Sequence, residues 1–378
     1  MLRSVVLVAL AAAVSAKKCH DFTVPVSISA NNTVFNIKPT NSEADLTNMM
    51  LKMVQPASTF LKSITGDMKE VHGDYNLAAT YCQPDSGPGK TIQILTHGVG
   101  FDRSYWDYPF NNYNYSYVDR AVEQGYSTLS WDRLGIAQSD HGKDPINEIQ
   151  VTLEIEALRA LTQKVHDGDA CGIPAKFDKH VHVGHSFGSI MSYGLTSLYP
   201  KLSDAIILTG FSQFPNYMPY FVLGGNFAPV SSIDTLKDKY ATGYIAPFSS
   251  IGVHINFFGP GDFDEDMLDD ATKNGQPAAL GELLNTGGPV GKPSEFGGDV
   301  LIITGDRDVP FCGGNCKDTS MLKDAKADNV LEISRSNFQK AKSFTATVVP
   351  DAGHGLNFGY SHTVTYKGML DFLKDKSL

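Results

Sequence analysis

The sequence has no excess of basic residues and no long runs of apolar residues. Its 378 residues include 31 Lys and Arg against 41 Asp and Glu, which gives a net charge of −10. This balance argues against a broad basic surface for nucleic acid. The apolar run at residues 5–14 is too short to cross the roughly 30 Å hydrocarbon core of a membrane, and no later run is long enough. Internal repeats and low-complexity tracts are also missing. We therefore expect no nucleic acid partner and no membrane span.

The N-terminus has the three zones of a secretory signal peptide. Arg3 precedes the apolar run, which leads into small residues ending at Ala16 and then into two lysines. This pattern predicts cleavage after Ala16 and a secreted, soluble mature protein. In a eukaryotic host, the Asn-x-Ser/Thr sequons at Asn31 and Asn114 would then be surface glycosylation sites.

Cysteine is scarce, with five residues in the whole chain. In an exported protein this number suggests two disulfides and one remaining thiol, although spacing alone does not fix the pairing. We predict that Cys19 pairs with Cys82 and Cys312 with Cys316. The second pair closes a short glycine-rich loop, and a metal site is disfavoured there because no second pair of Cys or His lies nearby. Cys171 is then the remaining thiol, expected as a small buried residue.

Strand and helix patterns alternate from residue 91 onward, which is typical of a parallel, doubly wound α/β sheet. Before residue 91, extended segments at 22–29, 34–37 and 76–81 predict antiparallel strands, and a helix is expected at 44–54. The methionines of that helix, Met49, Met50 and Met53, are interpreted as packing residues. The expected strands of the parallel part are 91–95, 126–131, 181–185, 205–208, 300–303 and 344–349, and its expected helices are 118–124, 151–165, 189–199 and 363–374.

The alternation stops between Phe211 and Gly298, a stretch too long for a plain loop in a compact domain. We interpret it as a cap over the strand ends, in which aromatic residues line an apolar pocket or pack the cap on the core. Its aromatic residues are Phe214, Tyr217, Tyr220, Phe221, Phe248, Phe257 and Phe258. The predicted organisation is a signal peptide at 1–16, N-terminal strands and a helical extension at 17–72, a first core part at 73–210, the cap at 211–298 and a second core part at 299–378.

A nucleophile is expected at Ser186, where the strand ending in Gly184-His185 meets the helix that begins near Gly188. Glycines two residues before and two after the serine allow a turn this sharp, and the turn pushes the hydroxyl out of the sheet. The helix N-terminus behind it favours developing negative charge. Gly-x-Ser-x-Gly also arises by chance, and the strand before it and the helix after it are the context that supports the motif.

Other chemistry-bearing residues follow the remaining strands. A serine needs a histidine to take its proton and a carboxylate to orient that histidine. His354 follows the last strand, and Asp306 and Asp308 follow the strand before it; His362, in or near the terminal helix, is expected at the surface. The turn after residue 95, His97-Gly98-Val99-Gly100, would expose backbone N–H groups suited to an oxyanion. Asp132 and Arg133 are interpreted as structural residues that hold neighbouring loop backbone by hydrogen bonds, with contact to the substrate as the alternative. Residues 105–117, rich in tyrosine and asparagine, are interpreted as a surface or pocket-rim loop.

Together these features resemble the α/β-hydrolase fold. The resemblance rests on the elbow 184–188, the His97-Gly98 turn, the Asp132-Arg133-x-Gly stretch, the Gly305-x-x-Asp308 acid and the Gly353-His354 base. It implies a mostly parallel central sheet with helices on both faces and a cap inserted between strands 6 and 7. It also implies Ser186 as nucleophile, His354 as general base and then acid, and Asp308 rather than Asp306 as orienting carboxylate. The oxyanion hole would be the backbone N–H groups of Val99 and Phe187.

The serine at the elbow indicates acyl transfer. Relatives that open epoxides or carbon–halogen bonds have Asp at this position, whereas serine supports an acyl-enzyme. The leading hypothesis is a secreted esterase or lactonase for a medium-sized apolar small molecule, with no metal or organic cofactor. Alternatives are an aminopeptidase or amidase, which would need a cap carboxylate such as Glu265 or Glu282 to hold an amine, an acyltransferase, and a non-catalytic ligand-binding protein.

Overall fold

The computed structural model describes residues 17–170, 172–288, 292–322 and 327–378. The predicted signal peptide and Cys171 lie outside the described residues. No helix in the described part of the chain is long and apolar enough to cross a membrane.

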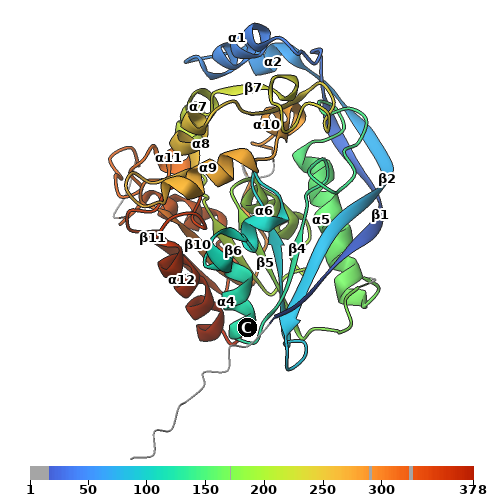
Figure 1. Ribbon diagram of the computed structural model, residues 1–378, viewed down its shortest axis with the longest axis vertical. Helices are drawn as coiled ribbons and strands as arrows, with labels where there is room; N and C mark the ends of the chain where they lie inside the picture. Colours follow the sequence, from blue (N-terminus) through green and yellow to red (C-terminus); the bar gives the residue numbers. More distant parts are fainter. Residues whose placement is uncertain (1–16, 171, 289–291, 323–326) are drawn as a thin grey trace, which may run out of the picture.

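One eight-stranded sheet organises the molecule, in the order β1-β2-β4-β3-β5-β6-β10-β11 (Figure 1). The strands from β4 across to β11 pair in parallel, whereas β1 pairs with β2 and β2 with β4 in antiparallel fashion. This confirms the predicted mostly parallel sheet, with its antiparallel strands at one edge. The strands are β1 (Lys17–Phe35), β2 (Thr65–Pro84), β3 (Thr91–Thr96), β4 (Ser127–Trp131), β5 (Lys179–His185), β6 (Ala205–Thr209), β10 (Asp299–Gly305) and β11 (Ser343–Val349).

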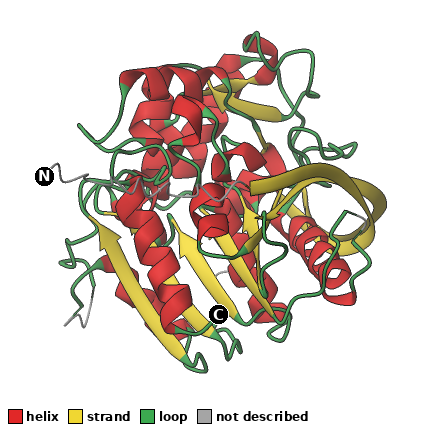
Figure 2. Ribbon diagram, turned by 60° about the horizontal axis from the view of Figure 1, so that its bottom comes forward, coloured by secondary structure: helices red, strands yellow, loops and turns green. Residues whose placement is uncertain are grey.

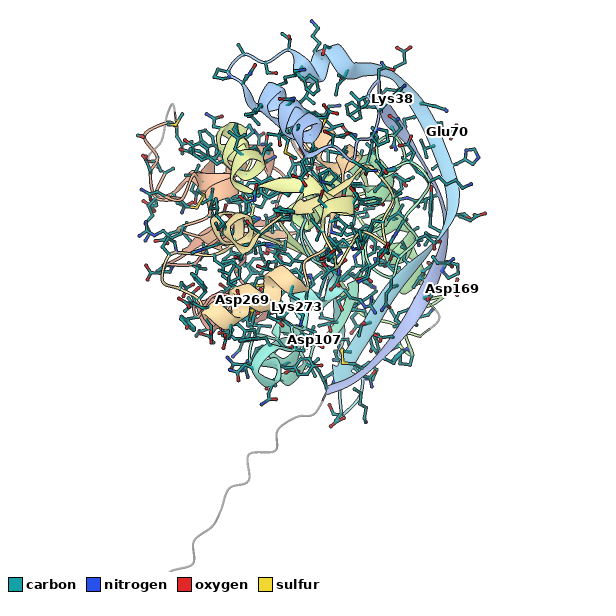
Figure 3. All side chains as sticks on the ribbon, turned by 45° about the horizontal axis from the view of Figure 1, so that its top comes forward. Lys38, Glu70, Asp107, Asp169, Asp269 and Lys273 are labelled. Atoms are coloured by element: carbon teal, nitrogen blue, oxygen red, sulfur yellow. A yellow bond between two sulfur atoms is a disulfide. The ribbon has the colours of Figure 1, made fainter. Side chains whose placement is uncertain are left out.

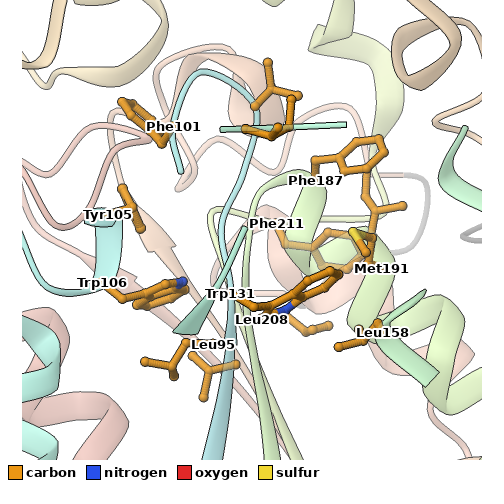
Figure 4. Close-up of a cluster of buried hydrophobic side chains, with 14 of the residues drawn as sticks. Leu95, Phe101, Tyr105, Trp106, Trp131, Leu158, Phe187, Met191, Leu208 and Phe211 are labelled. Atoms are coloured by element: carbon orange, nitrogen blue, oxygen red, sulfur yellow. The ribbon is translucent and has the colours of Figure 1, made fainter. Parts of the chain in front are cut away.

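Helices cover both faces of this sheet. The helix α5 (Val151–Asp167) has apolar residues at steps of three and four, and all of these are buried. It packs with α6 (Phe187–Leu198), while α4 (Tyr117–Glu123) packs with α12 (His362–Asp375) (Figures 1 and 2). Figure 4 shows part of the core, where Trp131 and Leu208 from the sheet meet Leu158 of α5 and Met191 of α6.

The cap lies between β6 and β10, which are the sixth and seventh strands of the main sheet in chain order. It contains a separate antiparallel sheet of β7, β8 and β9, surrounded by short helices. These elements are η2 (Pro215–Tyr217), α7 (Met218–Gly224), β7 (Phe227–Pro229), η3 (Val230–Ser232), β8 (Tyr244–Pro247), α8 (Ser250–Phe257), α9 (Glu265–Lys273), β9 (Ala278–Ala279) and α10 (Leu280–Leu284).

The strands β1 and β2 form a long ribbon that carries a helical arm at its outer end. The arm comprises α1 (Glu43–Val54), capped by the Ser42 side chain, and α2 (Phe60–Ile64). The ribbon curves along one side of the molecule, with Lys38 and Glu70 near its outer end in Figure 3, and α1 packs against α7 and β7 of the cap. The predicted boundary at residue 73 lies within β2, which continues through it.

Two expectations about exposure were wrong. Tyr105 and Trp106, expected in a surface or pocket-rim loop, are fully buried in the 3-10 helix η1 (Arg103–Trp106). There Tyr105 stacks on Phe101 and His185, and Trp106 packs edge-on against Tyr117. His362, expected at the surface, is also buried. It lies at the start of α12, where its Nδ1 is 2.8 Å from the carbonyl oxygen of Gly359 and its ring packs on Tyr115.

Candidate active site

Ser186 lies at a strained turn between β5 and α6. Its φ of 54° and ψ of −114° fall outside the regions that side-chain-bearing residues normally adopt. A Cβ atom at Gly184 would lie 2.3 Å from the carbonyl oxygen of Gly188, and one at Gly188 would lie 2.2 Å from that of Thr96. Only glycine therefore fits on either side of the serine, as the motif requires.

Ser186, His354 and Asp308 form a continuous hydrogen-bonded chain. The Oγ of Ser186 is 2.9 Å from Nε2 of His354, and Nδ1 of His354 is 2.8 Å from Oδ2 of Asp308. Asp308 is fully buried and accepts two further hydrogen bonds, from the Thr304 hydroxyl at 2.6 Å and the Phe311 N–H at 2.8 Å. Because the carboxylate accepts from Nδ1, the imidazole can keep its proton there and leave Nε2 free to accept the serine proton.

Asp306, the alternative carboxylate, points elsewhere. Its side chain makes ion pairs with Arg307 at 3.5 Å and Lys317 at 3.2 Å. His354 contacts Asp308 and has no hydrogen bond to Asp306 among the described residues. The geometry therefore brings Asp308, and not Asp306, to the histidine.

The loop that presents Asp308 is closed by a disulfide between Cys312 and Cys316. Asp308 caps the short helix α11 (Val309–Cys312), and its carbonyl oxygen accepts from the N–H groups of Cys312 and Gly314. The second disulfide joins Cys19 to Cys82 across the base of the β1–β2 ribbon. Both are the pairs named from the sequence. In the described residues, one group has the spacing of metal ligands, and it consists of Cys19, Cys82 and Asp107, whose two thiols are taken up by the disulfide.

Two backbone N–H groups are available beside Ser186. Neither the N–H of Val99 nor that of Phe187 donates a hydrogen bond to any residue that the structure describes, and both residues line the same cavity as Ser186. A Cβ atom at Gly98 would lie 2.9 Å from the Cβ of Ser186, so glycine is what allows the β3 turn to approach the serine. These are the two donors expected for an oxyanion hole.

His97 fixes the turn that carries Val99. Its Nδ1 lies 2.8 Å from the Gly98 carbonyl oxygen, and its Nε2 accepts the N–H of Arg133 at 3.0 Å. Burial lowers the pKa of His97 well below its usual value, and the neighbouring Arg133 lowers it further. Because Nε2 accepts a hydrogen bond and Nδ1 faces a carbonyl oxygen, this geometry requires a neutral imidazole with its proton on Nδ1.

His185, which the sequence indicates only as part of the elbow motif, lies beside His354. Its ring stacks on Tyr105 at 4.4 Å and lies 4.9 Å from the ring of His354. Burial, followed by the proximity of His354, lowers the pKa of His185 well below its usual value. This ring packs beside His354, and its buried surroundings disfavour a second positive charge there.

A cavity of about 550 Å³ opens above Ser186. Its walls come from the core, from the cap and from the helical arm, and no pattern in the sequence predicts the part that the arm plays. Met53, interpreted as a packing residue, lies in this wall, and of the seven cap aromatics only Phe221 does. The lining residues are Val99, Ser186, Phe187, Ile190, Pro310 and Phe311 of the core, Met218, Pro219, Phe221, Val222, Leu283 and Thr286 of the cap, and Met53, Val54, Gln55, Pro56, Ala57, Ser58 and Leu61 of the arm.

A buried charge cluster ties the cap to the core beneath this cavity. The guanidinium of Arg133 contacts Glu154 of α5 at 2.6 Å and also Glu282 of α10, and it lies 4.5 Å from the ring centre of Phe187. All three charged side chains are fully buried. Burial raises the pKa of Glu154 well above its usual range, and the carboxylate of Glu282 raises it further against the opposing effect of Arg133. The direction of this shift favours the neutral form of Glu154 beside the guanidinium.

This arrangement removes the support for an amine-binding carboxylate in the cap. Glu282 is occupied by Arg133 and by the N–H of Ala279, and Glu265 is exposed on α9. Neither side chain lines the cavity.

Replacing Arg133 with Met should lower the free energy of unfolding by about 3–5 kcal/mol, because the change removes the cation that contacts two fully buried carboxyl groups. Chemical denaturation followed by tryptophan fluorescence measures this. Glu154→Gln is the matched control. Because the surroundings of Glu154 favour its neutral form, a neutral side chain of the same shape should cost less than about 1.5 kcal/mol. An Arg133→Met protein within about 1 kcal/mol of the wild type would contradict a stabilising role for this buried cation.

Comparison with known proteins places this geometry in a family. The model of the alpha/beta hydrolase family matches residues 93–364. Comparison with curated proteins gave no significant match. Solved structures that resemble the chain include an esterase from Exiguobacterium antarcticum (14% identity, TM-score 0.52, covering 79% of this chain and 96% of that one), an enol-lactonase from Burkholderia xenovorans (15%, 0.50, 79% and 97%) and an epoxide hydrolase from Vigna radiata (12%, 0.52, 80% and 95%).

At such low identity these structures show the shared fold alone. The family match covers more than half of the sequence and includes the elbow, the acid loop and the histidine. The chain therefore belongs to the alpha/beta hydrolase family.

Proposed function

We propose that this chain is a secreted serine hydrolase that cleaves a carboxylic ester or lactone of a medium-sized apolar substrate through an acyl-enzyme. The observation that carries the proposal is the Ser186–His354–Asp308 chain of hydrogen bonds at the floor of an apolar cavity. Membership of a hydrolase family, together with an esterase and an enol-lactonase among proteins of the same fold, supports the reaction class.

In this mechanism Ser186 attacks the substrate carbonyl carbon while His354 takes the serine proton. The carbonyl oxygen becomes negative and receives hydrogen bonds from the N–H groups of Val99 and Phe187. When the tetrahedral intermediate collapses, the C–O bond to the alcohol breaks and His354 gives its proton to the departing oxygen. Water then attacks the acyl-enzyme by the same route, and Asp308 stabilises the imidazolium in both halves.

The cavity suggests the substrate class. No Asp, Glu, Lys or Arg is found among its described lining residues, and its polar side chains other than Ser186 are those of Gln55, Ser58 and Thr286. A charged group on either side of the ester would be desolvated there without a partner, which is costly. A volume of about 550 Å³ holds a ligand of moderate size. We therefore expect uncharged, apolar acyl and alcohol groups.

The test uses the purified protein with a series of p-nitrophenyl esters of increasing acyl length and with a fluorophosphonate label. We expect turnover with an optimum at medium chain length, and label located by mass spectrometry at Ser186 alone. Heat-denatured protein is the control and should take up no label. Well-folded protein that neither hydrolyses an ester nor reacts with the label would contradict the proposal.

Secretion gives a further prediction. Protein collected from the medium of a eukaryotic expression host should begin at Lys17 on N-terminal sequencing. Asn31 and Asn114 are both exposed, so we expect a glycosidase-sensitive mass at each. Protein that stays in the cells with residues 1–16 attached would contradict the predicted localisation.

A further inference from the structure

Large apolar side chains are exposed together on two helices of the cap. Of thirteen such side chains in the described part of the chain, five belong to α7, to α8 and to the turn before α8, and they are 43% to 68% exposed. We call these five residues the cap face: Tyr220, Leu223, Phe248, Ile251 and Ile255. Exposed apolar groups gathered in one place mark an interaction site, whereas single exposed apolar residues do not.

The five side chains belong to one continuous surface. Tyr220 and Leu223 are one turn apart on α7, and Ile251 and Ile255 are one turn apart on α8. The two helices touch at this point, because a Cβ atom at Gly224 would lie 2.6 Å from the Cγ2 atom of Ile255. The turn that carries Phe248 is held to the same region by a hydrogen bond from its N–H to the carbonyl oxygen of Asn226, at 2.9 Å. The two apolar rows therefore adjoin.

The sequence around the cap face is free of charge. Residues 205–233 and 240–261 contain no Asp, Glu, Lys or Arg, although 19% of the whole chain is charged and its net charge is −10. Binding that depends on charge, whether to an anionic membrane or to a charged protein surface, would need such residues here. The composition instead suits an uncharged apolar surface.

The cap face also borders the cavity above Ser186. Met218, Pro219 and Val222 of α7 line that cavity, while Tyr220 and Leu223 of the same helix point to solvent. Leu61 of the arm lines the cavity and is itself 38% exposed. An apolar molecule could therefore pass from a surface lying on α7 into the cavity while remaining in contact with apolar side chains.

We infer that the cap face docks the enzyme on the surface of an uncharged lipid aggregate, from which an apolar ester enters the cavity. The inference rests on the proposed function and specifies its substrate as an ester that resides in lipid. Apolar side chains inserted in the outer few ångströms of a lipid layer provide the binding energy in such contacts. The entrance to the cavity would then face the lipid.

The test measures flotation of the full mature protein with phosphatidylcholine vesicles. The variant Leu223→Gln/Ile251→Gln changes two exposed side chains that do not line the cavity. We expect wild type to bind the vesicles and this variant to bind them at least about tenfold more weakly. Turnover of dissolved p-nitrophenyl butyrate should change by less than about twofold. The matched control is Leu198→Gln, which changes a leucine that is 63% exposed at the end of α6, outside the cap. This variant should bind like wild type. Binding should survive high salt.

Four results would overturn the inference. The first two are a wild type that does not float with the vesicles and a double variant that floats as well as wild type. The third is binding that requires anionic lipid and disappears in high salt. The fourth is that wild type is a dimer while the double variant is a monomer, which would assign the cap face to a second copy of the chain. A different result would contradict the proposed function and not the docking surface. In that case the proteins would bind vesicles as expected, but wild type would hydrolyse neither dissolved nor vesicle-borne esters.

Discussion

Replacing Ser186 with Ala should lower kcat for a dissolved ester by a factor of about 10⁵ to 10⁶. The variant loses the only hydroxyl that lies 2.9 Å from Nε2 of His354 among the described residues, so no acyl-enzyme forms. The N–H groups of Val99 and Phe187 and the cavity are unchanged, and substrate affinity should therefore stay near that of wild type. Single-turnover kinetics and equilibrium binding of a non-hydrolysable amide analogue measure the two quantities independently.

Ser192→Ala is the matched control for this variant. Ser192 is a buried serine of α6, the helix that follows Ser186, and its hydroxyl donates to the carbonyl oxygen of Gly188 at 2.9 Å. Since that hydroxyl does not reach His354, kcat should remain within about tenfold of wild type. If Ser186→Ala keeps more than about 1% of wild-type activity after contaminating esterases are removed, the nucleophile lies elsewhere.

The sheet and its helices could be predicted because their signals are local. Apolar residues at steps of three and four along α5 give a helix with one buried face, and short apolar β-branched stretches such as β5 give central strands. In a parallel sheet the carboxyl ends of the strands meet at one edge, so side chains that follow β5, β10 and β11 converge. That geometric rule is why Ser186, Asp308 and His354 could be placed together from a sequence in which 168 positions separate the first from the last.

The contribution of the arm could not be predicted in this way. Whether α1 and α2 reach the cavity depends on how the long β1–β2 ribbon curves, and strand twist accumulates over many residues without a sequence signal of its own. The apolar side chains of α1 therefore indicated packing without indicating the partner. Met53 is an example: its apolar side chain was expected to pack, but its place in the cavity wall follows only from the fold.

Burial of polar and aromatic residues was also beyond local reasoning. Tyr105 lies in a segment whose tyrosines and asparagines favour a loop, yet its carbonyl oxygen accepts from Asn357 at 2.8 Å, more than two hundred residues away. Arg133 was expected to hold neighbouring backbone, and it instead contacts Glu282 across 149 positions. Such long-range partners decide whether a polar residue can be buried.

Asp308→Asn should lower kcat by about 10⁴-fold with little effect on substrate affinity. The N–H of Phe311 donates to Oδ1 of Asp308, so an asparagine would keep its oxygen there and turn its NH₂ group toward His354 and Thr304. Nδ1 of His354 would then have to accept, which places the ring proton on Nε2 and removes the base that faces Ser186. The loss should therefore appear in kcat, while the fold is preserved.

Asp306→Asn separates this explanation from a general effect of acidic side chains in the loop. Its carboxylate contacts only Arg307 and Lys317 among the described ionised partners, and both of these side chains are about half exposed, so their loss should cost no more than about 1 kcal/mol of stability. We expect kcat within about tenfold of wild type. If Asp306→Asn were the more damaging of the two changes, the orienting carboxylate would be Asp306 and the loop would rearrange when substrate binds. If both were mild, His354 would not need a carboxylate and the proposed mechanism would be wrong at this step.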